Sequence, residues 1–197
     1  MTADTHNRYQ QQKELAVKAA AAEFAARGYH GASTGEIAAR LGVKQGSLYY
    51  YFKSKEDALL EVCLYGIRDY ARRMEHIAAN DQPFEAKLLA IISSHLSSYR
   101  STNEALKVYN DERLYLSPDK RRQLKELGST YREHLEGVIE AAITDGVLRE
   151  DVDSHFAAQA VIGICNAWGD HIVRNPDLDI FELTQKCTDL LLRGFAR

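Results

Sequence analysis

The chain has 197 residues, of which 45% are apolar and 27% charged, a balance that excludes a disordered chain because enough apolar surface is available to build a core. The net charge of −3 argues against a general binder of polyanions. No apolar run reaches the roughly 18 residues of a membrane span, and the polar N-terminus lacks the apolar stretch of a signal peptide. The three widely spaced cysteines include no CxxC pair, which favours free thiols in a reducing cytoplasm.

Helix signals follow one another along the whole chain, and no segment shows the pattern of a strand. The predicted helices, in chain order, cover residues 8–27, 34–41, 45–51, 54–79, 83–99, 104–116, 118–145, 154–174 and 179–193. Gly28 and Gly42 are typical helix ends, and Ser33 with Glu36 has the spacing of a capping box. The sequence therefore predicts an all-α fold of about nine helices.

The charge is divided unevenly along the chain. Residues 1–55 contain eight Lys and Arg against four Asp and Glu, which gives +4, so the remaining residues carry −7. A small basic part on an acidic body indicates a nucleic-acid partner for the basic part.

Residues 33–52 have the pattern of a helix-turn-helix, in which the second helix enters the major groove of DNA. Gly42 supplies the turn. The residues with the spacing to form its small core are Phe24, Ile37, Leu41, Val43, Leu48 and Phe52. An ordinary amphipathic helical hairpin is the alternative interpretation of this pattern.

The polar residues left over from that core have the chemistry of DNA contacts. Gln45 can pair bidentately with adenine, and Lys44 can donate to guanine or to a phosphate. Hydroxyl groups can donate to phosphates, and Lys55 at the start of a long helix would add a backbone contact. The predicted DNA-binding residues are Ser33, Thr34, Lys44, Gln45, Gly46, Ser47, Tyr49, Tyr50 and Lys55.

Residues from about Lys13 to Val62 resemble the DNA-binding domain of the TetR family of bacterial transcriptional regulators. The matching residues are Ala19-Ala20, Phe24, Gly28-Tyr29, Thr34, Ile37-Ala38, Leu41-Gly42-Val43, Gly46-Ser47-Leu48-Tyr49-Tyr50 and Phe52-Lys53-Ser54-Lys55-Glu56. In two places the chain departs from the family pattern. Gly35 stands where some members carry a base-reading side chain, so that contact is absent, and Tyr51 replaces a frequent histidine.

One recognition helix covers only a few base pairs, so such proteins bind as dimers. In the resembled family, the last two helices of each subunit form a four-helix bundle, and here they carry small residues beside large apolar ones. The predicted dimer interface consists of Phe156, Ala160, Gly163, Ile164, Ala167, Phe181, Leu190 and Leu191. An intramolecular bundle is the alternative.

The resemblance implies that residues 1–55 bind DNA and that residues 56–197 form an effector-binding and dimerisation domain. Six of the 11 tyrosines lie between residues 65 and 131, and aromatic walls with a few polar groups are typical of ligand pockets. The predicted ligand-binding residues are Tyr65, Tyr70, Met74, His95, Tyr99, Tyr109, Tyr115, Asn166 and Trp168. Taken singly, each of them also fits plain core or surface.

Residues 108–153 and 160–168 resemble the subgroup of these regulators that responds to fatty or steroid-derived acyl-CoA thioesters. A CoA ligand needs cations for its phosphates, and those available are Arg72, Arg73, Arg113, Lys120, Arg121 and Arg122. The alternative for the run at 120–122 is a solvated helix face.

No catalytic or metal-binding pattern is present, since GxSxG, P-loop, GxGxxG and HxxxH are all missing. We therefore expect no cofactor and no enzymatic activity. The leading hypothesis is a homodimeric repressor that binds double-stranded operator DNA and is released by a small hydrophobic effector such as an acyl-CoA. The alternatives are a helical lipid carrier or enzyme that has lost DNA binding, and a constitutive DNA binder with a filled core.

Overall fold

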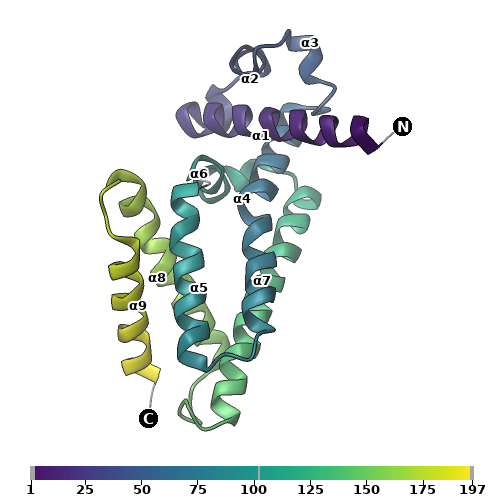
Figure 1. The fold of residues 1–197 in the computed structure, drawn as a ribbon. Coiled ribbons are helices and arrows are strands. Elements are labelled where there is room, and N and C mark those ends of the chain that lie inside the picture. Colours follow the sequence, from purple (N-terminus) through teal and green to yellow (C-terminus); the bar gives the residue numbers. More distant parts are fainter. Residues whose placement is uncertain (1–2, 102, 196–197) are drawn as a thin grey trace. The chain divides into compact units, whose positions relative to one another are not determined.

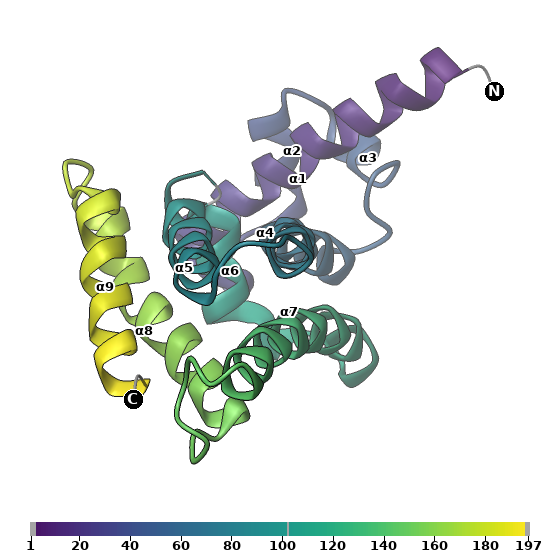
Figure 2. The same cartoon turned by 60° about the horizontal axis from the view of Figure 1, so that its bottom comes forward.

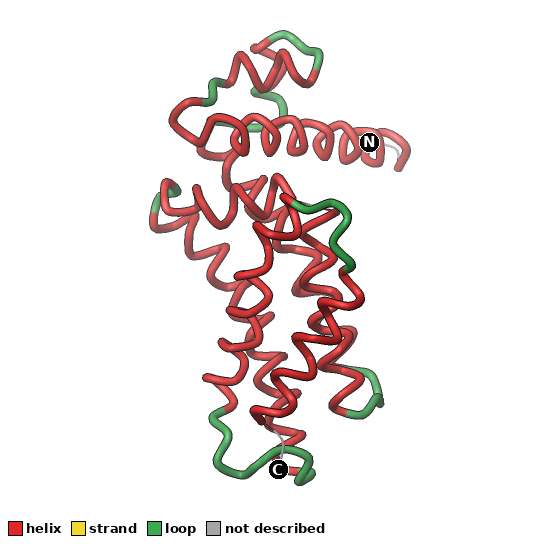
Figure 3. The backbone as a smooth tube through the Cα atoms, turned by 90° about the vertical axis from the view of Figure 1, so that its left-hand side faces the viewer, coloured by secondary structure: helices red, strands yellow, loops and turns green. Residues whose placement is uncertain are grey.

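The computed structural model describes residues 3–101 and 103–195, and these residues form helices joined by short loops, with no strand (Figures 1 and 3). The α-helices are α1 (Ala3–Gly31), α2 (Thr34–Leu41), α3 (Gln45–Leu48), α4 (Lys55–Ala78), α5 (Phe84–Ser101), α6 (Asn103–Glu112), α7 (Pro118–Thr144), α8 (Ser154–Arg174) and α9 (Ile180–Phe195). A 3-10 turn, η1 (Arg113–Tyr115), follows α6. The predicted all-α fold of nine helices is confirmed for the described residues.

None of the described helices combines the length and the apolar character that a membrane crossing requires.

The proximity of Cα atoms divides the chain into two compact units. The first unit is Met1–Ile67 with Glu104–Lys125, and the second unit is Arg68–Asn103 with Glu126–Arg197. Helices α4 and α7 each contribute residues to both units.

In the first unit, α2 packs against α1 and α3 packs against α2 (Figure 1). The start of α2 is fixed by the predicted capping box, because Ser33 Oγ accepts from the Glu36 backbone and the Glu36 carboxylate accepts from the Ser33 backbone. Gly42 ends the helix with a φ of 77°, which a residue with a side chain adopts only with strain. Phe24, Ile37 and Phe52 are buried in the core between these helices.

Helices α1, α3 and α6 differ from their predicted extents: α1 begins at Ala3 rather than at residue 8, and α6 ends at Glu112, before the 3-10 turn. Gly28 interrupts α1 with a φ of 71°, as a helix-ending glycine does, but one further helical turn continues to Gly31. Helix α3 ends at Leu48, and residues 49–51 form a turn instead of continuing the helix. The turn changes the direction of the chain, so that the Phe52 side chain is buried in the core. The Phe52 backbone N–H donates to the Leu48 carbonyl.

In the second unit, α5 packs against both α8 and α9, and Figure 2 shows these two helices beside it. The contact between α5 and α8 is close at Gly169, because a Cβ built there would lie 2.3 Å from Cε1 of the Tyr99 ring. Two of the three cysteines, Cys165 and Cys187, are buried in this unit and Cys63 is buried in the first. All three are free thiols, and burial raises the pKa of Cys63 and of Cys165 to about 12.

Candidate functional site

Six of the nine predicted DNA-binding residues lie in one exposed segment made of Lys44, α3 and the turn that follows it. Lys44, Gln45, Gly46 and Ser47 are exposed, and so are Tyr49 and Tyr50. Leu48, in contrast, points into the core, so the four-residue α3 presents its polar side chains outward. This surface has the composition that the grooves and phosphates of a duplex require.

Gln45 is held in place across the helix-turn-helix. Its side-chain amide donates to Thr34 Oγ1 at 2.9 Å, and its Oε1 faces the space beside Gly35. A Cβ at Gly35 would meet this oxygen at an ordinary contact distance of 3.8 Å, so the orientation of Gln45 is set by its bond to Thr34.

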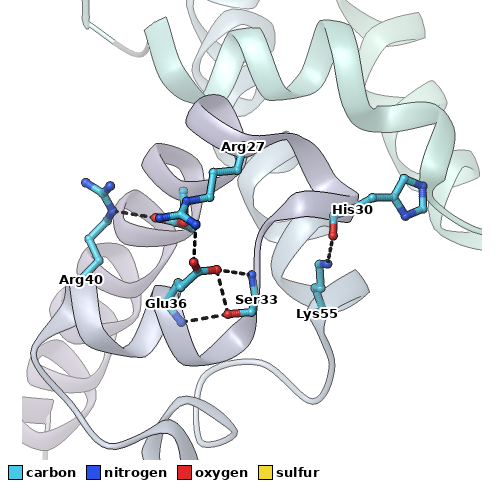
Figure 4. A network of polar contacts seen from close by, with 7 residues as sticks. Arg27, His30, Ser33, Glu36, Arg40 and Lys55 are labelled. Atoms are coloured by element: carbon cyan, nitrogen blue, oxygen red, sulfur yellow. Dashed lines mark hydrogen bonds and ion pairs between the residues drawn. The ribbon is translucent and has the colours of Figure 1, made fainter.

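An ionic network fixes α1 against α2 behind this surface (Figure 4). Arg27 and Arg40 both bond the buried carboxylate of Glu23, at 2.7 Å and 3.3 Å, and Arg27 also pairs with Glu36. The Ser33 hydroxyl group, which donates to Glu36 at 2.8 Å, holds the pKa of Glu36 below its usual value. Ser33 therefore serves as a helix cap in this structure, and two of the cations counted in residues 1–55, the exposed Arg27 and Arg40, are paired with carboxylates.

Half of those eight cations are paired with carboxylates. Besides Arg27 and Arg40, Lys13 pairs with Glu61 at 2.8 Å and Lys18 with Glu14 at 2.7 Å. The cations without an ion pair among the described residues are Arg8, Lys44, Lys53 and Lys55.

Lys55 is the first residue of α4 and is half-buried. Its ammonium group is 4.7 Å from the centre of the Tyr29 ring and 3.4 Å from the His30 carbonyl oxygen (Figure 4). The ammonium group has three N–H donors, so the two that do not bond the His30 carbonyl are available to a phosphate oxygen.

Residues 104–125 contact the N-terminal helices within the first unit. Glu112 accepts from the Tyr29 backbone N–H at 2.9 Å, and Lys107 donates to the Ala25 carbonyl at 3.0 Å, so both sides of the Gly28 break are bonded to α6. Tyr115 stacks on Tyr29 with 5.8 Å between ring centres. The N-terminal helices are thus held directly by the segment that follows α5.

A second contact of this kind joins the start of α7 to the start of α4. Lys120 bonds Glu56 at 3.0 Å and Asp57 at 2.7 Å, and the Ser117 backbone N–H donates to Glu56 at 2.7 Å. The bond from Ser117 lowers the pKa of Glu56, and the bond from Lys120 lowers that of Asp57. Lys120, which was a candidate for binding CoA phosphates, is occupied here by these two carboxylates.

Four of the predicted ligand-binding residues form one hydrogen-bonded cluster in the second unit. The Tyr99 hydroxyl group donates to Asn166 Oδ1 at 2.9 Å, His95 Nε2 lies 3.1 Å from the same oxygen, and the Tyr70 hydroxyl group donates to the His95 carbonyl at 3.3 Å. Tyr131 completes the cluster, with its hydroxyl oxygen 3.2 Å from His95 Nδ1. Sequence reasoning counted Tyr131 in the tyrosine excess but did not select it.

His95 is neutral at the centre of this cluster. Burial lowers its pKa to about 4, because a charged imidazole loses its hydration there. Asn166 Oδ1 can only accept, so Nε2 carries the proton and Nδ1 accepts from Tyr131. Burial likewise raises the pKa values of Tyr70 and Tyr131. Four side chains therefore bond one another as neutral groups, and Tyr70 bonds the His95 backbone.

A groove of about 490 Å³ lies beside the cluster between α4 and α5. It is lined by Arg72, Arg73, His76, Ile77 and Ser94. Arg73 links the groove to the cluster, since its guanidinium group donates to Ser94 at 2.8 Å and lies 5.4 Å from the centre of the Tyr70 ring. Both guanidinium groups also pair with the Asp69 carboxylate, Arg72 at 3.3 Å and Arg73 at 4.0 Å, so an anionic group in the groove would compete with Asp69 for them.

The remaining predicted ligand-binding residues do not join the cluster's hydrogen bonds. Met74 is fully buried core, and Trp168 is half-buried with its ring 5.3 Å from that of His171. Tyr65, Tyr109 and Tyr115 belong to the first unit. Sequence reasoning also missed His134 on α7, whose buried Nδ1 has no partner among the described residues.

The predicted dimer residues on α8 and α9 are mostly at the surface. Phe156 is 70% exposed, Phe181 65% and Leu190 64%, and Gly163 and Ala167 are exposed beside them. Ala160 and Ile164 are half-buried, and Leu191 is buried within its own chain. Large apolar side chains exposed in this number are typical of an interface.

Comparison with known families and relatives agrees with this architecture. The description "Bacterial regulatory proteins, tetR family" matches residues 16–62, and "Tetracyclin repressor-like, C-terminal domain" matches residues 81–195. The HTH-type transcriptional repressor KstR2 of Rhodococcus jostii (strain RHA1) is 32% identical over 155 residues, 78% of this chain and 76% of the relative. The fatty acid metabolism regulator protein of Bacillus subtilis (strain 168) is 26% identical over 182 residues, 90% of this chain and 92% of the relative.

Solved structures share the fold over nearly the whole chain. The TetR family transcriptional regulator PfmR from Thermus thermophilus has a TM-score of 0.84 at 24% identity, over 92% of this chain and 99% of that one. FadR from Bacillus subtilis in complex with stearoyl-CoA has a TM-score of 0.78 at 27% identity, over 92% and 98%. Because the two family descriptions together match most of its residues, the chain belongs to the TetR family and is a DNA-binding transcriptional regulator.

Proposed function

We propose that this chain is a homodimeric repressor whose release from its operator is caused by a fatty acyl-CoA thioester bound in the second unit. The observation that carries the proposal is Arg73, which joins a groove with two arginines to a cluster of neutral hydrogen-bonding groups centred on the buried His95. An acyl-CoA has matching chemistry, with anionic phosphates at one end, a thioester carbonyl and an apolar chain. The stearoyl-CoA complex of the Bacillus subtilis structure supports the same ligand class.

In this proposal the phosphates bind Arg72 and Arg73, and the thioester carbonyl accepts from a cluster hydroxyl group or from His134. The cluster side chains already bond one another, so a ligand has to replace some of these contacts. If the ligand binds a rearranged cluster more tightly than it binds the cluster described here, it shifts the conformational equilibrium towards the rearranged form. Such a shift is required for ligand binding to change the affinity for DNA. Helix α4 runs from Lys55 to Ala78 and contributes residues to both units.

Homodimerisation is proposed through α8 and α9. A repressor with one α3 per protomer needs two recognition helices about 34–36 Å apart, or a multiple of that, to read two half-sites. The exposed Phe156, Phe181 and Leu190 supply an apolar surface that a second copy of the chain can cover. In this proposal, residues 1–55 bind the operator, and residues 56–197 bind the effector and the second copy of the chain.

The ligand proposal predicts that Arg72→Gln weakens stearoyl-CoA binding about fivefold, since a charge-assisted contact at a partly exposed site is worth about 1 kcal/mol. Isothermal titration calorimetry on lipid-free protein measures this change. Arg68→Gln is the matched control, because Arg68 is an exposed arginine of the same helix outside the groove lining, and it should bind as the wild type does. Absence of binding heat with acyl-CoAs of every chain length would remove the proposed effector.

The DNA surface predicts different effects for its two central residues. Gln45→Ala should reduce the preference for the selected operator over unrelated duplexes about tenfold, because a bidentate base contact is worth about 1–3 kcal/mol. Lys44→Gln should weaken all duplexes alike and lower the salt dependence by about one phosphate contact. Fluorescence anisotropy with a duplex selected by the wild-type chain from a random library measures both. Equal weakening of every sequence by Gln45→Ala would show that Gln45 reads no base, and failure to select any duplex would favour the carrier alternative.

A further inference from the structure

Helix α1 extends beyond the part of the chain that the family description matches. That match begins at residue 16, whereas α1 begins at Ala3. From Arg8 to Ala16 alone the helix rises about 12 Å. The first turns of α1 therefore lie outside the matched segment, on the N-terminal side of the DNA-binding domain.

These turns are attached to the segment that follows α3. The Tyr9 ring meets the Tyr50 ring edge-on with 5.3 Å between centres and stacks on Tyr51 at 6.2 Å. One turn further on, Lys13 pairs with Glu61 of α4 at 2.8 Å. Figure 1 shows this end of α1 beside α3. Since Tyr50 is 69% exposed on the DNA-binding surface, Tyr9 makes the start of α1 an extension of that surface.

Residues 3–15 carry two cations, Arg8 and Lys13, and two carboxylates, Asp4 and Glu14. Lys13 is engaged by Glu61, so Arg8 is the cation that fits a phosphate. Residues 6–13 contain no carboxylate, and Arg8 has no ion pair among the described residues. The other cations of residues 1–55 that lack an ion pair, namely Lys44, Lys53 and Lys55, flank α3. Arg8 is exposed, and so is Gln12, which is one turn along on the same side of the helix.

We propose that Arg8 binds a backbone phosphate of the operator duplex beyond the segment that α3 contacts, with Gln12 as a second donor and Tyr9 as the positioning residue. The proposal rests on the operator binding proposed above. A guanidinium group binds phosphate oxygens bidentately, and glutamine amides donate to phosphates without reading sequence. Arg8 therefore contributes affinity and register rather than base preference.

The test measures anisotropy of the full-length chain with its selected duplex and with an unrelated duplex over a series of salt concentrations. Arg8→Gln is expected to weaken both duplexes about threefold to tenfold at low salt and to lower the slope of log affinity against log salt by about one. Tyr9→Ala is expected to give the same loss, because the helix start is no longer held beside Tyr50. Tyr9→Phe keeps the ring contacts and is expected to bind as the wild type does.

Lys18→Gln is the matched control, since it removes one positive charge from an exposed site on the same helix that already pairs with Glu14. Its slope should equal the wild-type slope. A wild-type slope for Arg8→Gln, or an equal drop for Lys18→Gln, would overturn the assignment of a phosphate to Arg8. If Lys44→Gln lowers the slope and Arg8→Gln does not, only this inference fails, whereas a wild type that selects no duplex refutes the proposed function itself.

Discussion

Replacing Gly169 by alanine is expected to lower the free energy of unfolding by about 3 kcal/mol, at the upper end of the usual cost of overpacking a core. The added Cβ would lie 2.3 Å from Tyr99 Cε1 and 2.5 Å from Cζ, far inside van der Waals contact. The ring cannot simply rotate away, because its hydroxyl group donates to Asn166 at 2.9 Å. Urea denaturation, with the midpoint and the slope fitted separately, measures the loss.

Gly137→Ala is the matched control for this variant. Gly137 lies inside α7 in the same unit, and a Cβ there meets nothing within 4 Å. Alanine should therefore stabilise the chain by up to about 1 kcal/mol through its higher helix propensity. A Gly169→Ala variant as stable as the wild type would show that Tyr99 does not pack against α8 in solution.

Acidification from about pH 7.5 to about pH 5 is expected to cost about 2 kcal/mol of stability through His95 alone. The pKa of His95 is lowered by burial to about 4 in the folded chain, against about 6.5 when unfolded. Between these values the unfolded state binds the additional proton, so stability rises with pH. The contribution is complete above about pH 6.5 and is lost as the pH falls towards 4.

The measurement compares urea denaturation of the wild type and His95→Gln at both pH values. The variant is expected to be less stable at neutral pH, because Tyr131 and Asn166 lose their partner, but to lose about 2 kcal/mol less on acidification. His6→Gln removes an exposed histidine and should keep the wild-type pH dependence. If the variant does not fold, the ring-proton NMR shift of His95 in the wild type provides the check, since a titration midpoint near 6.5 would contradict a neutral buried ring.

The helices were predictable because their ends depend on neighbours in sequence. Ser33 with Glu36, Ser54 with Asp57 and Asp153 with Phe156 form their capping hydrogen bonds as the residue types indicate. The extent of α3 was not predictable in the same way. The helix ends where it does because Phe52 has to reach a core to which α1 contributes. This is a tertiary contact, and helix propensity describes only the local sequence.

The candidate site likewise has one part that the local sequence predicts and another part that depends on tertiary contacts. Exposed polar residues of a helix-turn-helix follow from the pattern itself, and Lys44, Gln45 and Ser47 are at the surface. The cluster around His95 depends on the register of α5, α7 and α8, which are far apart in sequence, so Tyr131 gave no local signal. The four cations paired with carboxylates also could not be separated from the rest by counting charge, because three of their pairs cross between helices.

The burial of the three cysteines makes the chain convenient for site-directed labelling. Alkylating probes react with thiolates, and thiols that are buried with pKa values raised to about 12, as for Cys63 and Cys165, stay protonated and shielded. A single cysteine introduced at an exposed position such as Ser47 would then take a spin label in an otherwise native background. In a dimer, the distance between two such labels would report directly how far apart the recognition helices are, with and without acyl-CoA.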